Sequence, residues 1–340
     1  MASSELHETA RAIVADHKGI LAADESTGTM TKRLDSVGVE STEENRRFYR
    51  GLLFSAPGME ESIGGVILYD ETIRQAADDG TQFAELLASK GVVPGIKVDT
   101  GAHDLAGFPG EKVTEGLDGL RGRLEEYRDL GARFAKWRAV ITIGDGIPTD
   151  ACIRANAHAL ARYAALCQEQ GIVPIVEPEV LMDADNTAEV CYDATARTLH
   201  ALYDELFEQD VDLRGTLLKP NMVISGKGCA DQASSHEIAE LTIDCFLRHV
   251  PAVVPGIVFL SGGQSEVQAT ENLNAINRIG GAWPLSFSYG RALQASALAA
   301  WGGDAANAEA AQAAFAHRAR MNSLAVAGEW SAEMEQPVTA

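Results

Sequence analysis

Eight short apolar runs recur along the 340-residue chain, and helical patterns fill most of the gaps between them. Each run has the length of a strand, is rich in Val, Ile or Leu, and is bounded by Gly or Pro. The runs are 19–24, 63–69, 93–99, 134–143, 173–180, 215–221, 256–263 and 284–291. Eight strands alternating with helices predict an α/β fold, a (β/α)8 TIM barrel.

The helical segments carry recognisable start and stop signals. Ser41-Thr42-Glu43-Glu44 is typical of a capping box before a helix ending near Ala56. Thr149 is expected to be the N-cap of a helix over 150–170. Further helices are predicted over 117–130, 186–209, 235–249 and 264–278, with an alanine-rich helix after Gly302.

A doubly wound open sheet is the structural alternative. That fold normally places a Gly-rich dinucleotide turn after its first strand, and Asp24-Glu25-Ser26-Thr27-Gly28 is not one. No internal repeat or Pro-rich linker divides the chain. We therefore expect a single barrel domain over 1–327, followed by a loose C-terminal tail over 328–340.

Charge and cysteine content exclude several classes of partner and location. With 49 acidic and 28 basic residues the net charge is -21, which argues against nucleic acid or an anionic membrane as a partner. No apolar run reaches the ~18 residues of a membrane span, and residues 1–17 do not resemble a signal peptide. Five widely spaced cysteines without a C-x-x-C motif fit reduced thiols in the cytoplasm.

Charged residues occur inside several of the apolar runs, where they are costly unless they are paired or functional. Lys136 with Arg138, and Glu177 with Glu179, follow i, i+2 spacing, so each pair shares one face of its strand. Because barrel chemistry lies at the carboxyl ends of the strands, we assign that face to the barrel interior. Trp137 is then expected to face outward and to pack.

Three of the eight lysines lie inside these runs, in a chain that otherwise prefers arginine by twenty to eight. A lysine desolvated beside another cation can lose its proton and become a nucleophilic amine, which an arginine cannot do. Lys97, Lys136 and Lys219 are therefore candidates for amine chemistry. The alternative is that they are only ion-pair partners of Asp24, Glu177 and Glu179.

Two Gly-containing segments after the seventh and eighth runs resemble phosphate cradles. They are 261–265 (SGGQS) and 288–291 (SYGR). Glycines let backbone N–H groups approach an anion, a helix N-terminus favours negative charge, and Arg291 adds a fork of donors. Barrels often hold a phosphate between these two loops.

Metal ligands are not apparent in the sequence. The eight histidines are scattered, 236–240 lacks the second His of a zinc helix, and 183–186 lacks the Gly and closing acid of a calcium loop. We expect no metal site.

Long motifs across the chain closely resemble class I fructose-1,6-bisphosphate aldolase. The resemblance extends from about residue 10 to residue 324 and includes every predicted barrel strand. It rests on GILAADEST (19–27), TEENRRFYR (42–50), GIKVD (95–99), FAKWR (134–138), IVPIVEPE (172–179), GTLLKPNMV (215–223), FLSGGQS (259–265), LNAIN (273–277) and FSYGRALQASAL (287–298).

The resemblance implies catalytic roles for five residues. Lys219 matches the Schiff-base lysine, and Lys136 matches the neighbouring cation that favours its free amine. Glu177 matches the acid that protonates the departing hydroxyl, and Glu179 matches a carboxylate behind it. Asp24 matches the base that removes the C4 hydroxyl proton.

The resemblance also implies two phosphate sites. Residues matching the C1-phosphate site are Ser261, Gly262, Gly290 and Arg291. Residues matching the pocket for the other phosphate are Lys97, Arg138 and Arg33. Thr29 stands where the family usually has serine, and its hydroxyl preserves the phosphate contact.

The implied reaction is reversible cleavage of fructose-1,6-bisphosphate to dihydroxyacetone phosphate and glyceraldehyde-3-phosphate, with no cofactor and, by family habit, in a homotetramer. Cleavage leaves a carbanion that needs an electron sink, and without a histidine cluster an imine is the consistent choice over a metal. Alternatives are sedoheptulose-1,7-bisphosphate or fructose-1-phosphate as the main substrate, a metal-dependent mechanism, or a barrel scaffold with a binding role.

The sequence departs from the family pattern at its C-terminal end. Animal-type members of the family end in a tyrosine, whereas the last tyrosine of this sequence is Tyr289.

Overall fold

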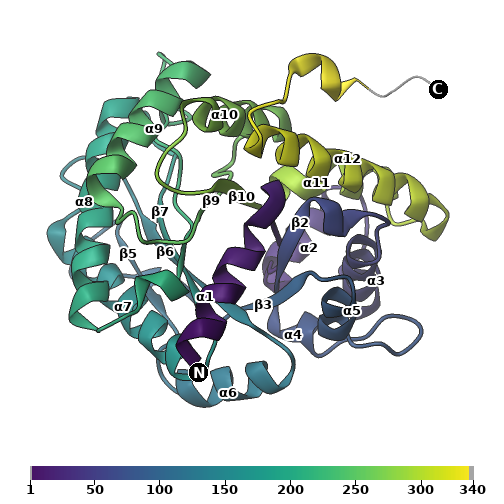
Figure 1. Ribbon diagram of the computed structural model, residues 1–340. Coiled ribbons are helices and arrows are strands. Elements are labelled where there is room, and N and C mark those ends of the chain that lie inside the picture. The colour runs from purple at the N-terminus through teal and green to yellow at the C-terminus, as the bar shows by residue number, and fades with distance from the viewer. Residues whose placement is uncertain (1, 337–340) are drawn as a thin grey trace.

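The eight predicted strands close into a parallel barrel in the computed structural model, which describes residues 2–336 (Figure 1). In order around the barrel they are β1 (Gly19–Ala22), β10 (Leu285–Tyr289), β9 (Ile257–Phe259), β8 (Leu217–Leu218), β7 (Val173–Val180), β6 (Phe134–Ile141), β3 (Val93–Lys97) and β2 (Ile63–Leu68). The barrel prediction is confirmed, and closure of the sheet excludes the doubly wound alternative.

Helices surround the barrel, most of them in an outer ring and the first of them across one end (Figure 1). They are α1 (Ala2–Ile13), α2 (Thr27–Asp35), α3 (Glu43–Phe54), α4 (Asp70–Ile73), α5 (Phe83–Ser89), α6 (Leu120–Asp129), α7 (Asp150–Glu169), α8 (Ala188–Glu208), α9 (Ser235–His249), α10 (Glu266–Ile279), α11 (Arg291–Trp301) and α12 (Ala308–Val326). None of these helices combines the length and apolarity that a membrane crossing requires within residues 2–336.

Helix N-termini follow the sequence signals, with one correction. Thr149 caps α7 by accepting a hydrogen bond from the N–H of Cys152. The capping box expected at 41–44 is wrong: Thr42 is the N-cap and accepts from the N–H of Asn45, so Glu44 lies one residue short of the position that closes a box. A complete capping box starts α9 instead, between Ser234 and Glu237.

A two-stranded hairpin, β4 (Gly101–Asp104) with β5 (Lys112–Glu115), follows β3 and was not anticipated. Its strands are short, and all but one of the residues of β4 are exposed or nearly so. These strands have no alternating apolar pattern, because the one residue of them that is buried is the polar Thr114. The hairpin places Gly101 and Ala102 at the rim of the barrel mouth.

The barrel interior changes from apolar to charged along β6 and β7. On β6 and β7 the inward residues begin with Phe134, Val173 and Ile175, which pack in one apolar cluster inside the barrel. Two residues further on, the same faces present Lys136 and Glu177. Trp137 faces the opposite way and contacts the ring of Tyr163 on α7 at a centroid distance of 5.6 Å. The assignment of the charged face to the interior is therefore confirmed.

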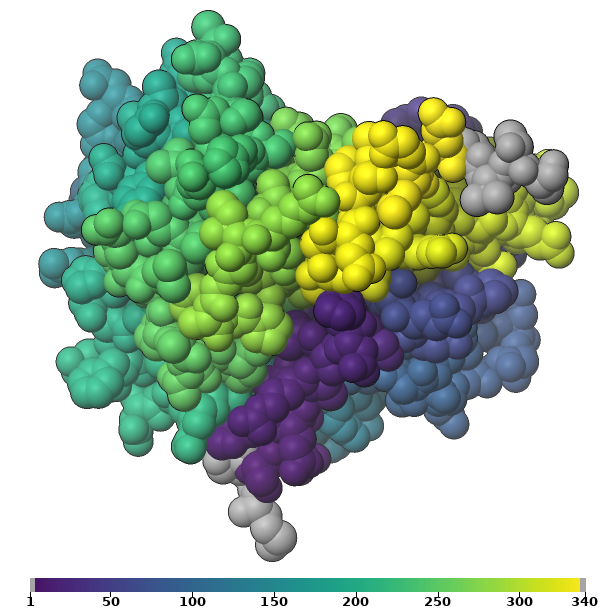
Figure 2. All heavy atoms as spheres, turned by 45° about the horizontal axis from the view of Figure 1, so that its top comes forward, coloured from purple at the N-terminus to yellow at the C-terminus, as the bar shows by residue number. Residues whose placement is uncertain are grey.

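Helix α1 closes the end of the barrel opposite the charges. Its Leu6, Ala10 and Ile13, with Val14 directly after it, belong to the same apolar cluster as Phe134, Val173 and Ile175. In the space-filling view α1, in purple, fills the space between the green and the blue parts of the chain (Figure 2). A small molecule therefore reaches the interior only from the carboxyl ends of the strands.

Gly95 in β3 makes room for the ring of Phe134 in this apolar layer, since a Cβ on Gly95 would lie 2.3 Å from that ring. We expect Gly95→Ala to destabilise the fold by about 1–3 kcal/mol, because the crowded barrel floor must shift. Thermal unfolding measures the loss. Gly122→Ala is the matched control: it lies in α6 with open space around it, so its Tm should stay equal or rise. Equal Tm changes for both variants would contradict the packing argument.

The described part of the predicted tail contacts the barrel. Trp330 is buried, and its backbone N–H donates to Oδ1 of Asn274 on α10. Its indole N–H donates to Glu335, which also pairs with Arg318 of α12. Residues 337–340 of the predicted tail lie outside the described residues. The domain boundary at 327/328 stays a prediction.

Candidate active site

The charged end of the barrel encloses a cavity of about 730 Å³. All thirteen residues that the sequence singled out line it: Asp24, Thr29, Arg33, Lys97, Lys136, Arg138, Glu177, Glu179, Lys219, Ser261, Gly262, Gly290 and Arg291. They come from the ends of β1, β3, β6, β7, β8, β9 and β10 and from the segments that follow these strands. Parallel closure of the sheet therefore brings together residues that are distant in the sequence.

At the centre of the cavity, Glu177 bridges two lysines. Its Oε1 lies 3.1 Å from Nζ of Lys219, and its Oε2 lies 3.2 Å from Nζ of Lys136. The Nζ of Lys136 also lies 2.8 Å from Oδ2 of Asp24. Each of the two lysines and Glu177 is almost fully buried, so these charges interact with little screening by water.

Strand register explains why these groups meet. Arg138 of β6 lies opposite Glu177 of β7, and Val176 lies opposite Leu218 of β8. The backbone N–H of Lys219 donates to the carbonyl of Val176 at 2.8 Å, which extends that pairing one residue past β8. The side chains of Lys136, Glu177 and Lys219 thus enter the barrel at neighbouring levels.

The charges set the protonation states of this group. Burial favours the neutral acid, but Lys136 and Lys219 outweigh it and hold the pKa of Asp24 at about 2. Burial likewise opposes the ionised form of Glu177, and the same two lysines lower its pKa below the ordinary value. Burial opposes the charge of Lys136 as well, yet Asp24 and Glu177 raise its pKa. Asp24 and Glu177 are therefore anionic and Lys136 cationic at neutral pH.

The third lysine, Lys97, is only partly buried and has a different environment. Lys97 contacts Asp99, with its Nζ 2.8 Å from Oδ1 and 2.9 Å from the backbone carbonyl. Asp99 also accepts from the N–H of Arg138, whose guanidinium pairs with Glu179. Lys97 and Arg138 thus form one side of the cavity, each with its own carboxylate. For Lys97 the ion-pair alternative describes its contacts, with Asp99 in place of the partners named from sequence.

The opposite wall of the cavity carries two glycine turns. Gly262 and Gly263 have φ values of 56° and 87°, and Ser265 then caps α10. Gly290 lies between β10 and α11, where a Cβ would be 3.3 Å from the carbonyl of Ala22. Backbone N–H groups of these turns and the side chain of Arg291 therefore line one concave surface of the cavity.

Arg33 lies beside this wall. A Cβ on Gly290 would be 3.5 Å from its Nη2. Its guanidinium pairs with Glu25, which also accepts from the side-chain amide of Gln294 at 2.9 Å. Arg33 is therefore held next to the glycine turn that matches the C1-phosphate site. Its assignment to the other phosphate stays a prediction.

Polar cavity residues that were not among the predicted site residues include Glu25, Ser288 and Lys227. Glu25 and Ser288 belong to the motifs 19–27 and 287–298, and their position at the ends of strands is a signal that could have identified them. The hydroxyl of Ser288 is buried at the cavity wall and has no hydrogen-bond partner within residues 2–336. Lys227 lies in an irregular loop after β8, and no periodic pattern identifies it.

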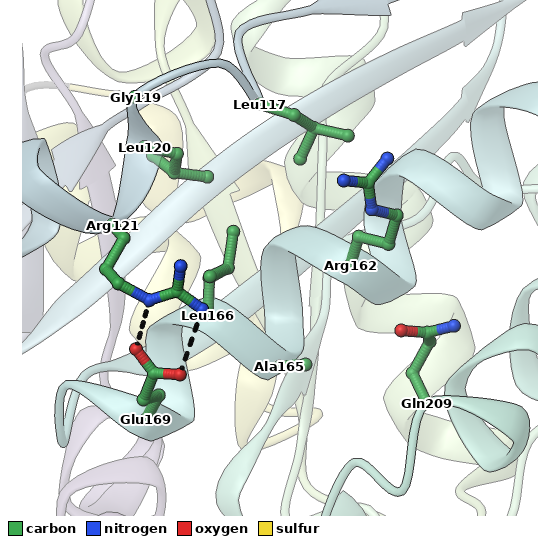
Figure 3. A pocket seen from close by; sticks show the side chains of 9 residues that line it. All are labelled: Leu117, Gly119, Leu120, Arg121, Arg162, Ala165, Leu166, Glu169 and Gln209. Carbon is green, nitrogen blue, oxygen red and sulfur yellow. Dashed lines mark hydrogen bonds and ion pairs between the residues drawn. The ribbon is translucent and has the colours of Figure 1, made fainter.

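A second hollow, of about 390 Å³, lies on the outside of the barrel between α6, α7 and the end of α8 (Figure 3). Leu117, Leu120 and Leu166 line it, and Arg121 pairs with Glu169 at 2.6 Å across one side. Both members of that pair are largely exposed to solvent. Charges in exposed pairs of this kind interact only weakly, because water screens them. We therefore place the active site in the barrel cavity, where the charged groups are buried.

Comparison with known proteins agrees with this geometry. The family model described as "Glycolytic: Fructose-bisphosphate aldolase class-I" matches residues 5–340. A probable fructose-bisphosphate aldolase class 1 of Xanthomonas campestris is 59% identical over 332 residues, which cover 97% of this chain and 99% of that protein. Fructose-bisphosphate aldolase C-B of Danio rerio is 54% identical over 329 residues, covering 96% and 91%.

A solved structure is similar over nearly the whole chain. It is a ternary complex of fructose-bisphosphate aldolase from Plasmodium falciparum with TRAP and a small-molecule inhibitor, with a TM-score of 0.96 and 47% identity. The match covers 97% of this chain and 96% of that one. On these matches and on its barrel, the chain belongs to the class-I fructose-bisphosphate aldolase family, whose members are carbon–carbon lyases.

Proposed function

We propose that Lys219 forms the imine through which this chain cleaves fructose-1,6-bisphosphate reversibly. The observation that carries this assignment is the bridge that Glu177 makes between Lys219 and Lys136. A nucleophilic amine needs a neighbour that accepts its proton and another cation that disfavours its charge. Lys219 is the one lysine of the described residues that contacts Glu177 without contacting a second carboxylate.

Glu177 serves the formation of the imine. The proton of the Lys219 ammonium passes to Glu177, and the free amine adds to the C2 ketone to give a carbinolamine. Glu177 then returns that proton to the C2 hydroxyl, which leaves as water, and a protonated imine remains. A second proton moves from the amine nitrogen to the former ketone oxygen as the carbinolamine forms, so both hydrogens of the departing water come from the Lys219 ammonium and one hydrogen stays on the imine nitrogen. Glu179 pairs with the guanidinium of Arg138, whose positive charge also favours the ionised form of Glu177.

Asp24 serves the cleavage step. Its low pKa keeps it anionic, and it accepts the proton of the C4 hydroxyl as the C3–C4 bond breaks. The electron pair of that bond moves to the imine and forms an enamine, while C4 becomes the aldehyde of glyceraldehyde-3-phosphate. Protonation at C3 and hydrolysis of the imine release dihydroxyacetone phosphate. Lys136, 2.8 Å from Asp24, balances the negative charge throughout.

The two ends of the cavity hold the two phosphates. Ser261, Gly262, Gly290 and Arg291 supply hydroxyl, backbone and guanidinium donors for the C1-phosphate. Lys97 and Arg138 supply charge for the other phosphate, with Thr29 of α2 at the rim. Since each of these cations already has a carboxylate partner, the second phosphate is held less firmly than the first.

Substrate comparison tests the proposed function. We expect kcat/KM to be highest with fructose-1,6-bisphosphate and lower with fructose-1-phosphate, because the monophosphate has no second phosphate for Lys97 and Arg138 to bind. Activity should survive excess EDTA, because class-I members use the lysine imine in place of a metal. A preference for sedoheptulose-1,7-bisphosphate would change the substrate assignment. Loss of all activity in EDTA would contradict the imine.

We further propose that the chain works in the cytoplasm as a homotetramer. Support comes from the resemblance to the family, the thiol pattern and the length of chain shared with its relatives. Light scattering coupled to size-exclusion chromatography measures the mass, which should be four times 36.2 kDa. A monomer of full activity would contradict the tetramer without affecting the catalytic assignments.

A further inference from the structure

We propose that Lys227 binds the C1-phosphate of the substrate together with Arg291. This inference rests on the proposed function, because it adds a residue to the phosphate site described above. Lys227 lines the same cavity as Lys219 and Arg291, although it lies in the loop that follows β8. The phosphate is then held by residues that follow three successive strands, β8, β9 and β10.

The position of Gly263 locates the cation. A Cβ on Gly263 would lie 2.6 Å from Nζ of Lys227 and 3.1 Å from Nη2 of Arg291. Two cations from separate loops therefore approach the same point above the glycine turn. Placing like charges side by side is unfavourable unless an anion lies between them, and the turn below offers backbone N–H groups to such an anion.

The local charge balance leaves room for a phosphate. Lys227 pairs with Asp183 at 2.7 Å, and both side chains are largely exposed. Arg291 makes no ion pair with any residue of the described range 2–336. One carboxylate thus faces two cations beside the turn. A phosphate dianion would supply the missing negative charge, in a chain whose net charge of -21 otherwise repels anions.

The backbone around Lys227 is held in place. Its N–H donates to the carbonyl of Met182 at 2.7 Å, and the N–H of Gly228 donates to the carbonyl of Ala184 at 2.9 Å. A Cβ on Gly226 would lie 2.2 Å from the carbonyl of Ala184, so only glycine permits this close approach. The loop after β8 is therefore fastened to the loop after β7, and the lysine stem starts from a fixed point.

The test compares Lys227→Gln with the wild-type chain. We expect KM to rise about 5- to 20-fold for both fructose-1,6-bisphosphate and fructose-1-phosphate, because both carry the C1-phosphate. The change in kcat should be less than about 2-fold, since the charge acts on binding. Inorganic phosphate, used as a competitive inhibitor, should weaken by a similar factor. Lys227→Arg keeps the charge and should restore most of the affinity.

Lys112→Gln is the matched control. Lys112 is about as exposed as Lys227 and also pairs with one aspartate, Asp104, but it lies on the hairpin and does not line the cavity. Both variants lose one positive charge, so an effect of net charge alone would appear in both. We expect KM in Lys112→Gln to stay within about 2-fold of wild type.

Each outcome separates this inference from the proposed function. If the wild-type chain cleaves the bisphosphate and Lys227→Gln leaves both KM values unchanged, the inference is wrong and the proposed function stands. If KM rises for the bisphosphate only, Lys227 serves the other phosphate and the placement is wrong. If the wild-type chain cleaves neither sugar, the proposed function itself fails. Circular dichroism of Lys227→Arg and Lys227→Gln distinguishes a folding defect from a binding one.

Discussion

Lys219→Met is expected to lower kcat for fructose-1,6-bisphosphate cleavage on the order of 10⁵-fold, because the amine that becomes the electron sink is removed. Methionine keeps the length of the side chain and suits the buried position at the end of β8, so the barrel should still fold. The measurement is steady-state cleavage, together with borohydride trapping of dihydroxyacetone phosphate and peptide mass spectrometry. Wild type should carry the reduced adduct on the peptide that contains Lys219, and the variant should carry none.

Lys97→Met is the control for this experiment. It removes another lysine of the same cavity. Lys97 pairs with Asp99, whereas Lys219 pairs with Glu177. Its adduct with dihydroxyacetone phosphate should form as in wild type, since that product carries only the C1-phosphate, while KM for the bisphosphate rises. An adduct on Lys136 in Lys219→Met, or undiminished cleavage, would show that the nucleophile has been assigned to the wrong lysine.

The barrel and the direction of its charged face were predictable because both depend on local periodicity. Short apolar runs ending in Gly or Pro are visible one at a time, and i, i+2 spacing places Lys136 and Glu177 on inward faces without any knowledge of their neighbours. The hairpin after β3 was missed for the complementary reason. Its strands pair only with each other, and the one buried residue of these strands is the polar Thr114, so they leave no apolar alternation in the sequence.

The contacts between the residues of the site were less predictable than the identity of those residues. That Glu177 joins two lysines depends on the register of β6, β7 and β8, which no single strand records. Asp99 pairs locally with Lys97, but its second contact, with the N–H of Arg138 on β6, again depends on how the strands pair. Lys227 was missed because it approaches Gly263 only after two loops are hydrogen-bonded together. Long-range loop contacts of this kind have no counterpart in local sequence pattern.

Asp24→Asn is expected to separate cleavage from imine formation. Asparagine matches aspartate in shape but does not accept a proton, so kcat for the bisphosphate should fall by about 10²- to 10⁴-fold. The amine of Lys219 and its partner Glu177 remain in place, so the borohydride adduct with dihydroxyacetone phosphate should still form. Asp104→Asn is the control, because Asp104 also pairs with a lysine but lies on the hairpin outside the cavity, and its activity should equal wild type.

The pH dependence of this defect identifies the base. Because Lys136 and Lys219 hold the pKa of Asp24 at about 2, this carboxylate stays ionised from about pH 5 to 9 and loses its charge only as the pH falls through its own pKa. The ratio of wild-type to Asp24→Asn turnover should therefore be constant over that range. A ratio that grows as the pH rises would mean that a group titrating near neutrality removes the C4 proton. Equal loss of cleavage and of the trapped adduct would instead mean that Asp24 acts by keeping Lys136 in position, and that the carbon–carbon bond is broken with the help of another base.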